Sequence, residues 1–479
     1  MTFQIEEATI RDIQEALQAG IVTSKQLVQQ YIDRIEALDQ NGPKINAIRQ
    51  INPDALFLAE VCDKERGKEK QGPLYGVPII LKDNIDTADK MATTAGSVAL
   101  KDNYAKRDAF IVSKLREAGA IILGTANLTE FANFMAYEMP NGYSSLGGQV
   151  LNPYKPGVFD VGGSSAGTGA AVAANLVTAG IGTETSGSIL SPASSNSLVG
   201  LKPTVGLVSR SGIIPISHSQ DTAGPLTKTV EDAAIMLNAI AGYDEADIVT
   251  KNCVDNVPSD YTAFLLENGL NESRIGIDRS TFNELSANEK AVMEESISTI
   301  EKLGATIIDP IEVSAPELDM VVMKHEFKHD LNAYLENVSD AVPVHNLEEI
   351  IAYNKNHAEV ALRYNQELLE DSQAMSDDPN DSTYLESRAS DVKYAGELGI
   401  DTTMKQHNLD AILSVNNWGA ALPAKAGYPS ITVPAGYTDE GKPVGVTFSA
   451  KAFSEPTLLK FGYAYEQATK HRKQPMVNN

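Results

Sequence analysis

Between residues 161 and 212 the chain departs from ordinary globular composition and becomes rich in glycine and hydroxyl residues. This Gly/Ser run reads VGGSSAGTGAAVAANLVTAGIGTETSGSILSPASSNSLVGLKPTVGLVSRSG. Glycines allow backbone N–H groups to approach a ligand and to adopt turns that other residues resist, and serines supply nucleophiles. A flexible linker would lack the apolar stretch AAVAANLVTAGIG within the run. The run therefore predicts rigid loops that carry a catalytic site.

Apolar segments around the Gly/Ser run alternate between strand and helix character. The stretch LYGVPIILKDNIDT has a short apolar core that ends at Lys82, which predicts a buried strand with a reactive group at its carboxyl end. Residues 109–120 predict a helix, residues 121–125 a strand and residues 127–134 a second helix. The stretch AAVAANLVTAG in the run also has helical character. Such alternation is typical of a sheet with helices on both faces.

Helix starts near the N-terminus are marked by two capping pairs. Thr9 with Asp12 and Thr23 with Gln26 have the spacing in which each side chain bonds the other's backbone. Apolar residues then recur every three to four positions, so two helices are expected before the first strand.

The predicted fold is a single large α/β/α domain spanning residues 1–479, with a mixed, mostly parallel central sheet covered by helices. We expect N-terminal helices over 1–60 and a discontinuous core over 61–250 and 408–479. Charged segments of helical character over about 285–400 predict an inserted helical cap. The stretches LDAILSV, GYPSITVPAG and PVGVTFSA then return as strands.

Composition limits the classes of partner. With 42% hydrophobic residues the chain can bury a sizeable core, and its formal charge of -25 argues against nucleic acid and anionic membrane surfaces. Cys62 and Cys253 lie far apart, without the spacing of a disulfide framework or a zinc site. We expect a cytoplasmic protein without a membrane segment, although an export signal already removed would leave the same sequence. Nothing in the sequence indicates an oligomeric state.

Several motifs resemble those of the amidase signature family of serine hydrolases. They are GVPIILKDNIDT, GTANLTEFAN, GGQVLNPYKPG, GGSSAGTGAAVA, GTETSGSILSPAS, GLKPTVGLVSRSG, QDTAGPL and AGYPSITVPAG, in the family's order over most of the chain. Within the family the chain looks most like the bacterial peptide amidases. The resemblance implies a cofactor-free hydrolase that cleaves a carboxamide to an acid plus ammonia or an amine through an acyl-enzyme. The expected substrate is a small-molecule or peptide amide, with peptide C-terminal amides as one candidate.

The resemblance also implies a catalytic triad made of Lys82, Ser164 and Ser188. Ser188 matches the nucleophile, and Ser164, the first serine of GGSSAG, matches a relay serine that follows a cis peptide bond. Lys82 matches the base, and independent physical reasoning supports such a role because burial can keep a lysine neutral at working pH. The implied oxyanion hole consists of the backbone N–H groups of Thr185, Ser186, Gly187 and Ser188.

Two positions depart from the common family pattern. Ser186 stands where many members have a glycine, and a non-glycine there resembles the peptide amidase branch. Leu190 stands where an arginine is common, and the loss of that guanidinium removes a bidentate partner for a substrate carboxylate. Leu190 therefore favours a substrate that is neutral near the scissile bond. Asn416, Asn417 and Trp418 are further candidates for substrate binding.

Two other functions remain open on the sequence. One is a glutamine-using amidotransferase-type subunit that acts within a complex, against which Leu190 argues. The other is a zinc metalloprotease, because HEFKH at residues 325–329 fits the H-E-x-x-H pattern. The HEFKH segment lies in the charged helical insert and lacks an extended zinc protease signature, so we expect no metal there.

Overall fold

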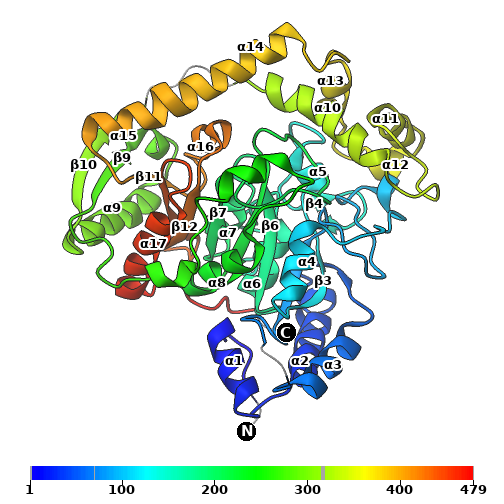
Figure 1. Ribbon diagram of the computed structural model, residues 1–479, viewed down its shortest axis with the longest axis horizontal. Coiled ribbons are helices and arrows are strands. Elements are labelled where there is room, and N and C mark those ends of the chain that lie inside the picture. Colours follow the sequence, from blue (N-terminus) through cyan, green and yellow to red (C-terminus); the bar gives the residue numbers. More distant parts are fainter. Residues whose placement is uncertain (1–2, 69–70, 314–318, 478–479) are drawn as a thin grey trace.

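Strands from the whole length of the chain join in one sheet in the computed structural model, which describes residues 3–68, 71–313 and 319–477 (Figure 1). Within these residues the sheet has 11 strands in the order β1-β3-β2-β6-β8-β7-β12-β13-β11-β9-β10. Their bounds are β1 (Ile48–Ile51), β2 (Pro78–Lys82), β3 (Ile121–Ala126), β6 (Ala179–Glu184), β7 (Val199–Lys202), β8 (Thr222–Thr227), β9 (Arg274–Asp278), β10 (Thr306–Ile311), β11 (Ala411–Val415), β12 (Ser430–Tyr437) and β13 (Pro443–Ser449). A separate hairpin pairs β4 (Tyr143–Ser144) with β5 (Gly148–Gln149).

The remaining regular elements of the described residues are mostly helices. The α-helices are α1 (Ile10–Gln18), α2 (Ser24–Arg34), α3 (Ala55–Glu65), α4 (Phe110–Glu117), α5 (Glu130–Asn133), α6 (Ala166–Ala173), α7 (Leu190–Ser195), α8 (Val230–Ile240), α9 (Ala287–Lys302), α10 (Val321–Leu335), α11 (Leu347–Asn356), α12 (Ala358–Ala361), α13 (Glu367–Gln373), α14 (Ser382–Asp391), α15 (Thr402–His407), α16 (Ala421–Ala426) and α17 (Glu455–Thr469). Shorter 3₁₀ segments are η2 (Val98–Leu100), η3 (Ile248–Cys253), η4 (Tyr261–Phe264) and η5 (Arg279–Phe282). Two π-helical segments, η1 (Ile35–Gln40) and η6 (Val392–Asp401), continue α2 and α14.

The sheet is mixed, as the sequence predicts. Strands β3, β2 and β6 run parallel at one side, and β11, β9 and β10 run parallel at the other. The pairs between these two groups, from β6 through β8, β7, β12 and β13 to β11, are antiparallel, as is the pair of β1 with β3. Among the described strands antiparallel pairs thus outnumber parallel pairs, so the expected predominance of parallel pairing holds only within the two groups.

The sheet is covered on both faces, which confirms the single α/β/α domain. A Cβ added to Gly200 or Gly445 would meet Ala193 and Ser194 of α7, so α7 covers one face. A Cβ added to Gly462 of α17 would meet Ile431 and Val433 on the opposite face of β12. Helix α6 packs beside α7, and α8 beside α17. The sheet strands between them are almost entirely buried.

The predicted capping pairs are present at the N-terminus. Thr9 accepts from the backbone of Asp12 and Thr23 from that of Gln26, and each partner's side chain bonds back, at the starts of α1 and α2. The helix expected over 127–134 is reduced to the short α5, in which Phe131 and Ala132 have left-handed φ angles of 47° and 53°. This segment therefore bends into a loop.

The helical cap exists, but it begins later than the sequence predicts. Helix α9 and strand β10 lie within the expected insert of 285–400, yet β10 pairs with β9 as part of the main sheet. The cap proper consists of α10 to α14, which arch along the top of the view in Figure 1. It packs on the core through an apolar cluster in which Phe327 and Leu331 meet Phe131, Phe134 and Ile216.

Candidate active site

Lys82 ends β2, the central strand of a parallel group, and its side chain is fully buried. Its Nζ donates to Ser164 Oγ at 2.7 Å, to Thr183 Oγ1 at 2.9 Å and to the Thr183 carbonyl at 3.2 Å. Burial lowers the pKa of Lys82 to about 7, although Asp221 and Glu184 act in the opposite direction. The amine is therefore held among oxygen acceptors and can be neutral near neutral pH.

Ser164 lies before α6 and is also fully buried. The Gly163–Ser164 peptide bond is cis, as the resemblance implies. The Ser164 carbonyl accepts from the Thr129 N–H at 3.0 Å, and the Ser165 N–H donates to the Ser188 carbonyl at 3.2 Å. The backbone at Ser164 is thus tied to neighbouring loops while its hydroxyl faces Lys82.

Ser188 closes a turn, residues 185–188, that leaves β6 and enters α7; we call it the nucleophile turn. Ser188 is 7% exposed, and Gly187 adopts a φ of +83°, a conformation that favours glycine. A Cβ added at Gly187 would lie 3.2 Å from the Asn417 Nδ2 atom. Strands β2 and β6 are parallel neighbours, so the ends of these strands bring Lys82, Ser164 and the nucleophile turn into one region. Among the hydrogen bonds of the described residues, Ser188 is linked to Ser165 rather than directly to Ser164.

Glu184, which the sequence analysis did not single out, holds the nucleophile turn through three hydrogen bonds. Its buried carboxylate accepts from the N–H groups of Gly187 at 2.7 Å, Ile189 at 2.7 Å and Leu190 at 3.0 Å. These bonds hold the nucleophile turn and the start of α7. They also engage the Gly187 N–H, one of the four N–H groups that we expect to form an oxyanion hole. An acidic residue three positions before a glycine in a strand-to-helix turn was the available signal.

Asp221 supports the other side of the nucleophile turn. Its carboxylate accepts from Thr185 Oγ1 at 2.5 Å and from the N–H groups of Ile216 at 2.8 Å and Ser217 at 2.9 Å. Burial raises the pKa of Asp221 to about 6 against these hydrogen bonds. Asn84 Nδ2 donates to Thr183 Oγ1 at 3.0 Å, next to Lys82.

One cavity adjoins the nucleophile turn, and a second lies near it. The Thr185 cavity, of about 210 Å³, is lined by Asn84, Thr183 and Thr185, by an apolar wall of Ala132, Ile213, Ile214 and Ile216, and by charged residues that include Arg210, Asp221, Asp247 and Asp330. The Trp418 cavity, of about 510 Å³, is lined by Asn416, Asn417, Trp418 and Ser191 among others. The three predicted binding residues therefore line a cavity near Gly187, and Trp418 is 51% exposed at its surface.

Leu190 lies outside the lining of the two cavities. It is 1% exposed, and it begins α7. Neither of these two cavities therefore brings Leu190 into contact with a ligand, and its expected role in substrate selection stays a prediction.

The ring nitrogens of the two HEFKH histidines contact backbone carbonyls of the cap rather than a shared metal-binding position. His325 Nε2 and His329 Nε2 lie 3.1 Å from the carbonyls of Asp378 and Ser376. Within the described part of the chain, the one group with metal-ligand proximity is His218, Glu326 and Asp330, which contains neither histidine of the motif. There the Glu326 carboxylate already accepts from serine and tyrosine hydroxyls. The donor set fits a hydrogen-bonded cluster better than a zinc protease site.

Over the described residues no helix combines the length and apolarity that a membrane crossing requires. The Amidase family model matches residues 26–459. A probable amidase of Arabidopsis thaliana is 42% identical over 99% of this chain and 92% of its own length. A glutamyl-tRNA(Gln) amidotransferase subunit from Halorhodospira halophila is 32% identical over 98% of this chain and 99% of its own length.

Solved structures of amidases and of an amidotransferase subunit are also similar to this chain. The native peptide amidase of Stenotrophomonas maltophilia has a TM-score of 0.92 and 41% identity, covering 99% of each chain. An amidase family protein of Bacillus anthracis has a TM-score of 0.94 and 41% identity, covering 98% of this chain and 92% of its own. The corresponding glutamyl-tRNA(Gln) amidotransferase subunit from Thermotoga maritima is more distant, with a TM-score of 0.73 and 25% identity over 100% of this chain and 99% of its own.

Proposed function

The chain belongs to the amidase family, and from that premise we propose that its amide-hydrolysing chemistry uses Ser188 as nucleophile, Ser164 as relay and Lys82 as base. The observation that carries this proposal is the 2.7 Å hydrogen bond from Lys82 Nζ to Ser164 Oγ inside the core. A lysine in bulk water would be almost fully protonated at neutral pH. Burial brings the pKa of Lys82 to about 7, where a large fraction of the amine can accept a proton.

In the proposed cycle Ser188 Oγ attacks the amide carbonyl, and its proton passes through the Ser164 hydroxyl to Lys82. The tetrahedral oxyanion is stabilised by the backbone N–H groups of Thr185, Ser186 and Ser188 in the nucleophile turn. Collapse of the intermediate breaks the C–N bond, and the leaving nitrogen takes the proton from Lys82 by the same route. Water then attacks the acyl-enzyme, which releases the acid and restores Ser188. No cofactor takes part in these steps.

The substrates that we propose are carboxamides of peptide-like or small apolar acids, including peptide C-terminal amides. Support comes from the peptide amidase of Stenotrophomonas maltophilia, which is 41% identical over 99% of both chains. The Thr185 cavity has an apolar wall, and the Trp418 cavity has amide side chains that suit a polar backbone. We propose that these cavities receive the groups on the two sides of the scissile bond.

An ammonia-release assay tests this function. C-terminally amidated peptides, fatty-acid amides, aryl amides and glutamine are offered separately to the purified chain. We expect ammonia from amidated peptides at rates well above those from glutamine. Turnover of glutamine alone, dependent on an added partner, would instead favour the amidotransferase-type alternative that the relatives of about 32% identity represent.

A further inference from the structure

One carboxylate of the cap is buried against the core. Glu326 lies on α10 and is 1% exposed. It accepts from Ser217 Oγ at 2.5 Å, from Ser219 Oγ at 2.5 Å and from the Ser219 N–H at 3.0 Å. Tyr384 OH of α14 adds a fourth donor at 2.8 Å from within the cap. Three of the four donors therefore belong to a core loop, residues 216–221, which we call the serine loop.

The serine loop also reaches the nucleophile turn. Asp221, at its end, accepts from the N–H groups of Ile216 and Ser217 and from the Thr185 hydroxyl. Gln220 Nε2 donates to the Thr185 carbonyl at 3.4 Å. Glu326 and Thr185 are thus joined through one short loop that is hydrogen-bonded at both ends.

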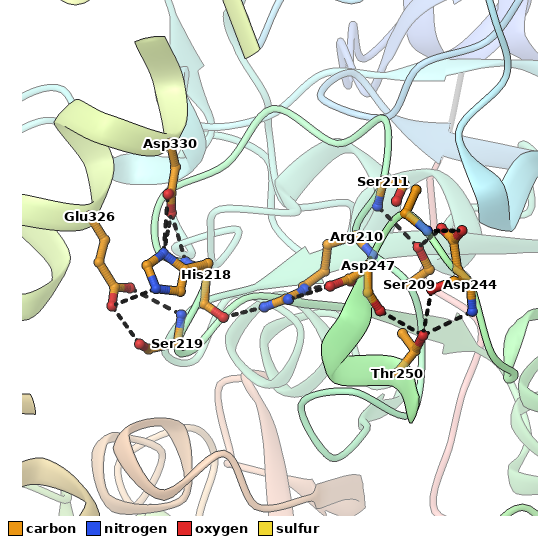
Figure 2. Close-up of polar contacts among 11 residues, drawn as sticks. Ser209, Arg210, Ser211, His218, Ser219, Asp244, Asp247, Thr250, Glu326 and Asp330 are labelled. Carbon is orange, nitrogen blue, oxygen red and sulfur yellow. Dashed lines mark hydrogen bonds and ion pairs between the residues drawn. The ribbon is translucent and has the colours of Figure 1, made fainter. Parts of the chain in front are cut away.

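The surroundings of Glu326 keep it ionised. Burial opposes ionisation of its carboxyl, but His218 and the serine donors outweigh that effect and hold the pKa of Glu326 below its ordinary value. Figure 2 shows His218 between Glu326 and Asp330, with ring nitrogens 3.3 Å and 3.0 Å from the two carboxylates. Next to it, the Arg210 guanidinium donates to the His218 carbonyl and pairs with Asp247. A buried charge with such dedicated partners fixes the geometry of those partners.

We propose that Glu326 is a positioning residue for hydrolysis, which fixes the serine loop and, through Asp221, the Thr185 end of the nucleophile turn. This inference rests on the proposed function. It assigns the cap a role in hydrolysis, because the position of α10 sets the direction of a donor group beside the reacting carbonyl. Displacements of about 1 Å in such groups can cost about 100-fold in rate.

The test compares Glu326→Gln with Asp371→Asn. Asp371 lies in the cap near the same helix, and among the described residues its side chain bonds Lys324 at 2.7 Å and Tyr137 at 2.6 Å rather than the serine loop. For Glu326→Gln we expect kcat per fluorophosphonate-reactive site to fall about 10- to 100-fold. KM and the melting temperature should change little, because three of the four donors to Glu326 are hydroxyls, which can turn to accept from an amide N–H₂ group. Asp371→Asn should keep the wild-type kcat.

A double variant tests whether the effect of Glu326→Gln on kcat depends on Asp221. The combination Glu326→Gln with Asp221→Asn should cost less than the product of the two single effects, because both changes release the same loop. If Glu326→Gln fails to fold, Ser219→Ala removes one donor and leaves the carboxylate with Ser217, Tyr384 and a backbone partner. It should lower kcat in the same direction by a smaller factor.

An unchanged kcat per reactive site in Glu326→Gln, or in Ser219→Ala where the first variant does not fold, would overturn the inference. So would a fall in melting temperature that accounts for all lost activity through a smaller reactive fraction. If the wild-type chain itself releases no ammonia and does not react with the fluorophosphonate, the proposed function fails instead.

Discussion

Lys82 Nζ and Ser164 Oγ lie 2.7 Å apart, and both side chains have no exposed surface. A charged ammonium in this position would be costly because few water molecules can solvate it. The burial of this pair therefore explains why the pKa of the Lys82 amine is low.

Activity should rise with pH through neutrality. Because burial lowers the pKa of Lys82 to about 7, kcat/KM should fall about tenfold per pH unit below that value and level off above it. Protonation of Asp221, whose pKa burial raises to about 6, should steepen the loss at lower pH. Initial rates on one amide between pH 5 and 9 check this. A flat profile across this range would rule out Lys82 as the base.

Replacement of Ser188 by alanine should remove the covalent step. We expect hydrolysis to fall at least about 10⁴-fold and fluorophosphonate labelling to disappear. Ser164→Ala should retain the nucleophile but lose the relay, so labelling should be slow rather than absent. Intact-mass spectrometry of labelled protein distinguishes these cases, with Ser280→Ala, an exposed serine, as the control. Normal labelling of Ser188→Ala would place the nucleophile elsewhere.

Glu184→Gln should disturb the nucleophile turn. The carboxylate accepts three backbone N–H groups, and an amide replaces one acceptor oxygen by an N–H₂ group that opposes them. We expect a loss of about 1–3 kcal/mol in the free energy of unfolding and a kcat at least tenfold lower. Urea denaturation and steady-state kinetics measure the two effects. Wild-type values for both would show that the turn holds its shape without Glu184.

Leu190→Arg should destabilise the fold rather than create a carboxylate-binding site. The side chain is 1% exposed, so a guanidinium would be buried without a partner at a cost of about 3–5 kcal/mol. Leu190→Met, which conserves apolar volume, is the control and should stay near the wild-type value. Urea unfolding of both variants decides the matter. A stable arginine variant that hydrolyses glutamine would show that this site can open.

Chelation should leave turnover unchanged. His325 and His329 contact backbone carbonyls of the cap, so His325→Ala should lower the melting temperature without a large change in kcat. Dialysis against EDTA followed by an ammonia-release assay and metal analysis is the measurement. Loss of activity that stoichiometric zinc restores would revive the HEFKH interpretation.

The sequence predicted those features that short patterns determine. The capping pairs at Thr9 and Thr23 and the strand that ends at Lys82 depend on residues close together in the chain, and they are confirmed. The start of the cap was wrong, because the charged helix α9 is followed by β10, whose partner β9 precedes it. The composition of residues 285–311 alone does not show that β10 pairs with β9.

The site was predicted less completely than the fold. Family motifs selected Lys82, Ser164 and Ser188, whose roles stay predictions, and the structure brings their segments together. The proposed roles of Glu184 and Glu326 were not predicted from the sequence, because these roles depend on which backbone N–H groups and hydroxyls the two carboxylates accept from. The burial of Leu190, whose role toward a substrate also stays a prediction, could not be inferred from its position in the sequence.

The parallel pairing of β2 with β6 has a consequence for redesign. Neighbouring strands are held about 4.8 Å apart by their ladder, so the strand ends that carry Lys82 and the nucleophile turn keep their spacing when the cap is changed. A cap from another amidase could therefore be grafted between β10 and β11 to exchange selectivity while the hydrolytic centre is inherited unchanged. Such a chimera should need a carboxylate at the position of Glu326, because the grafted cap must still accept hydrogen bonds from the serine loop.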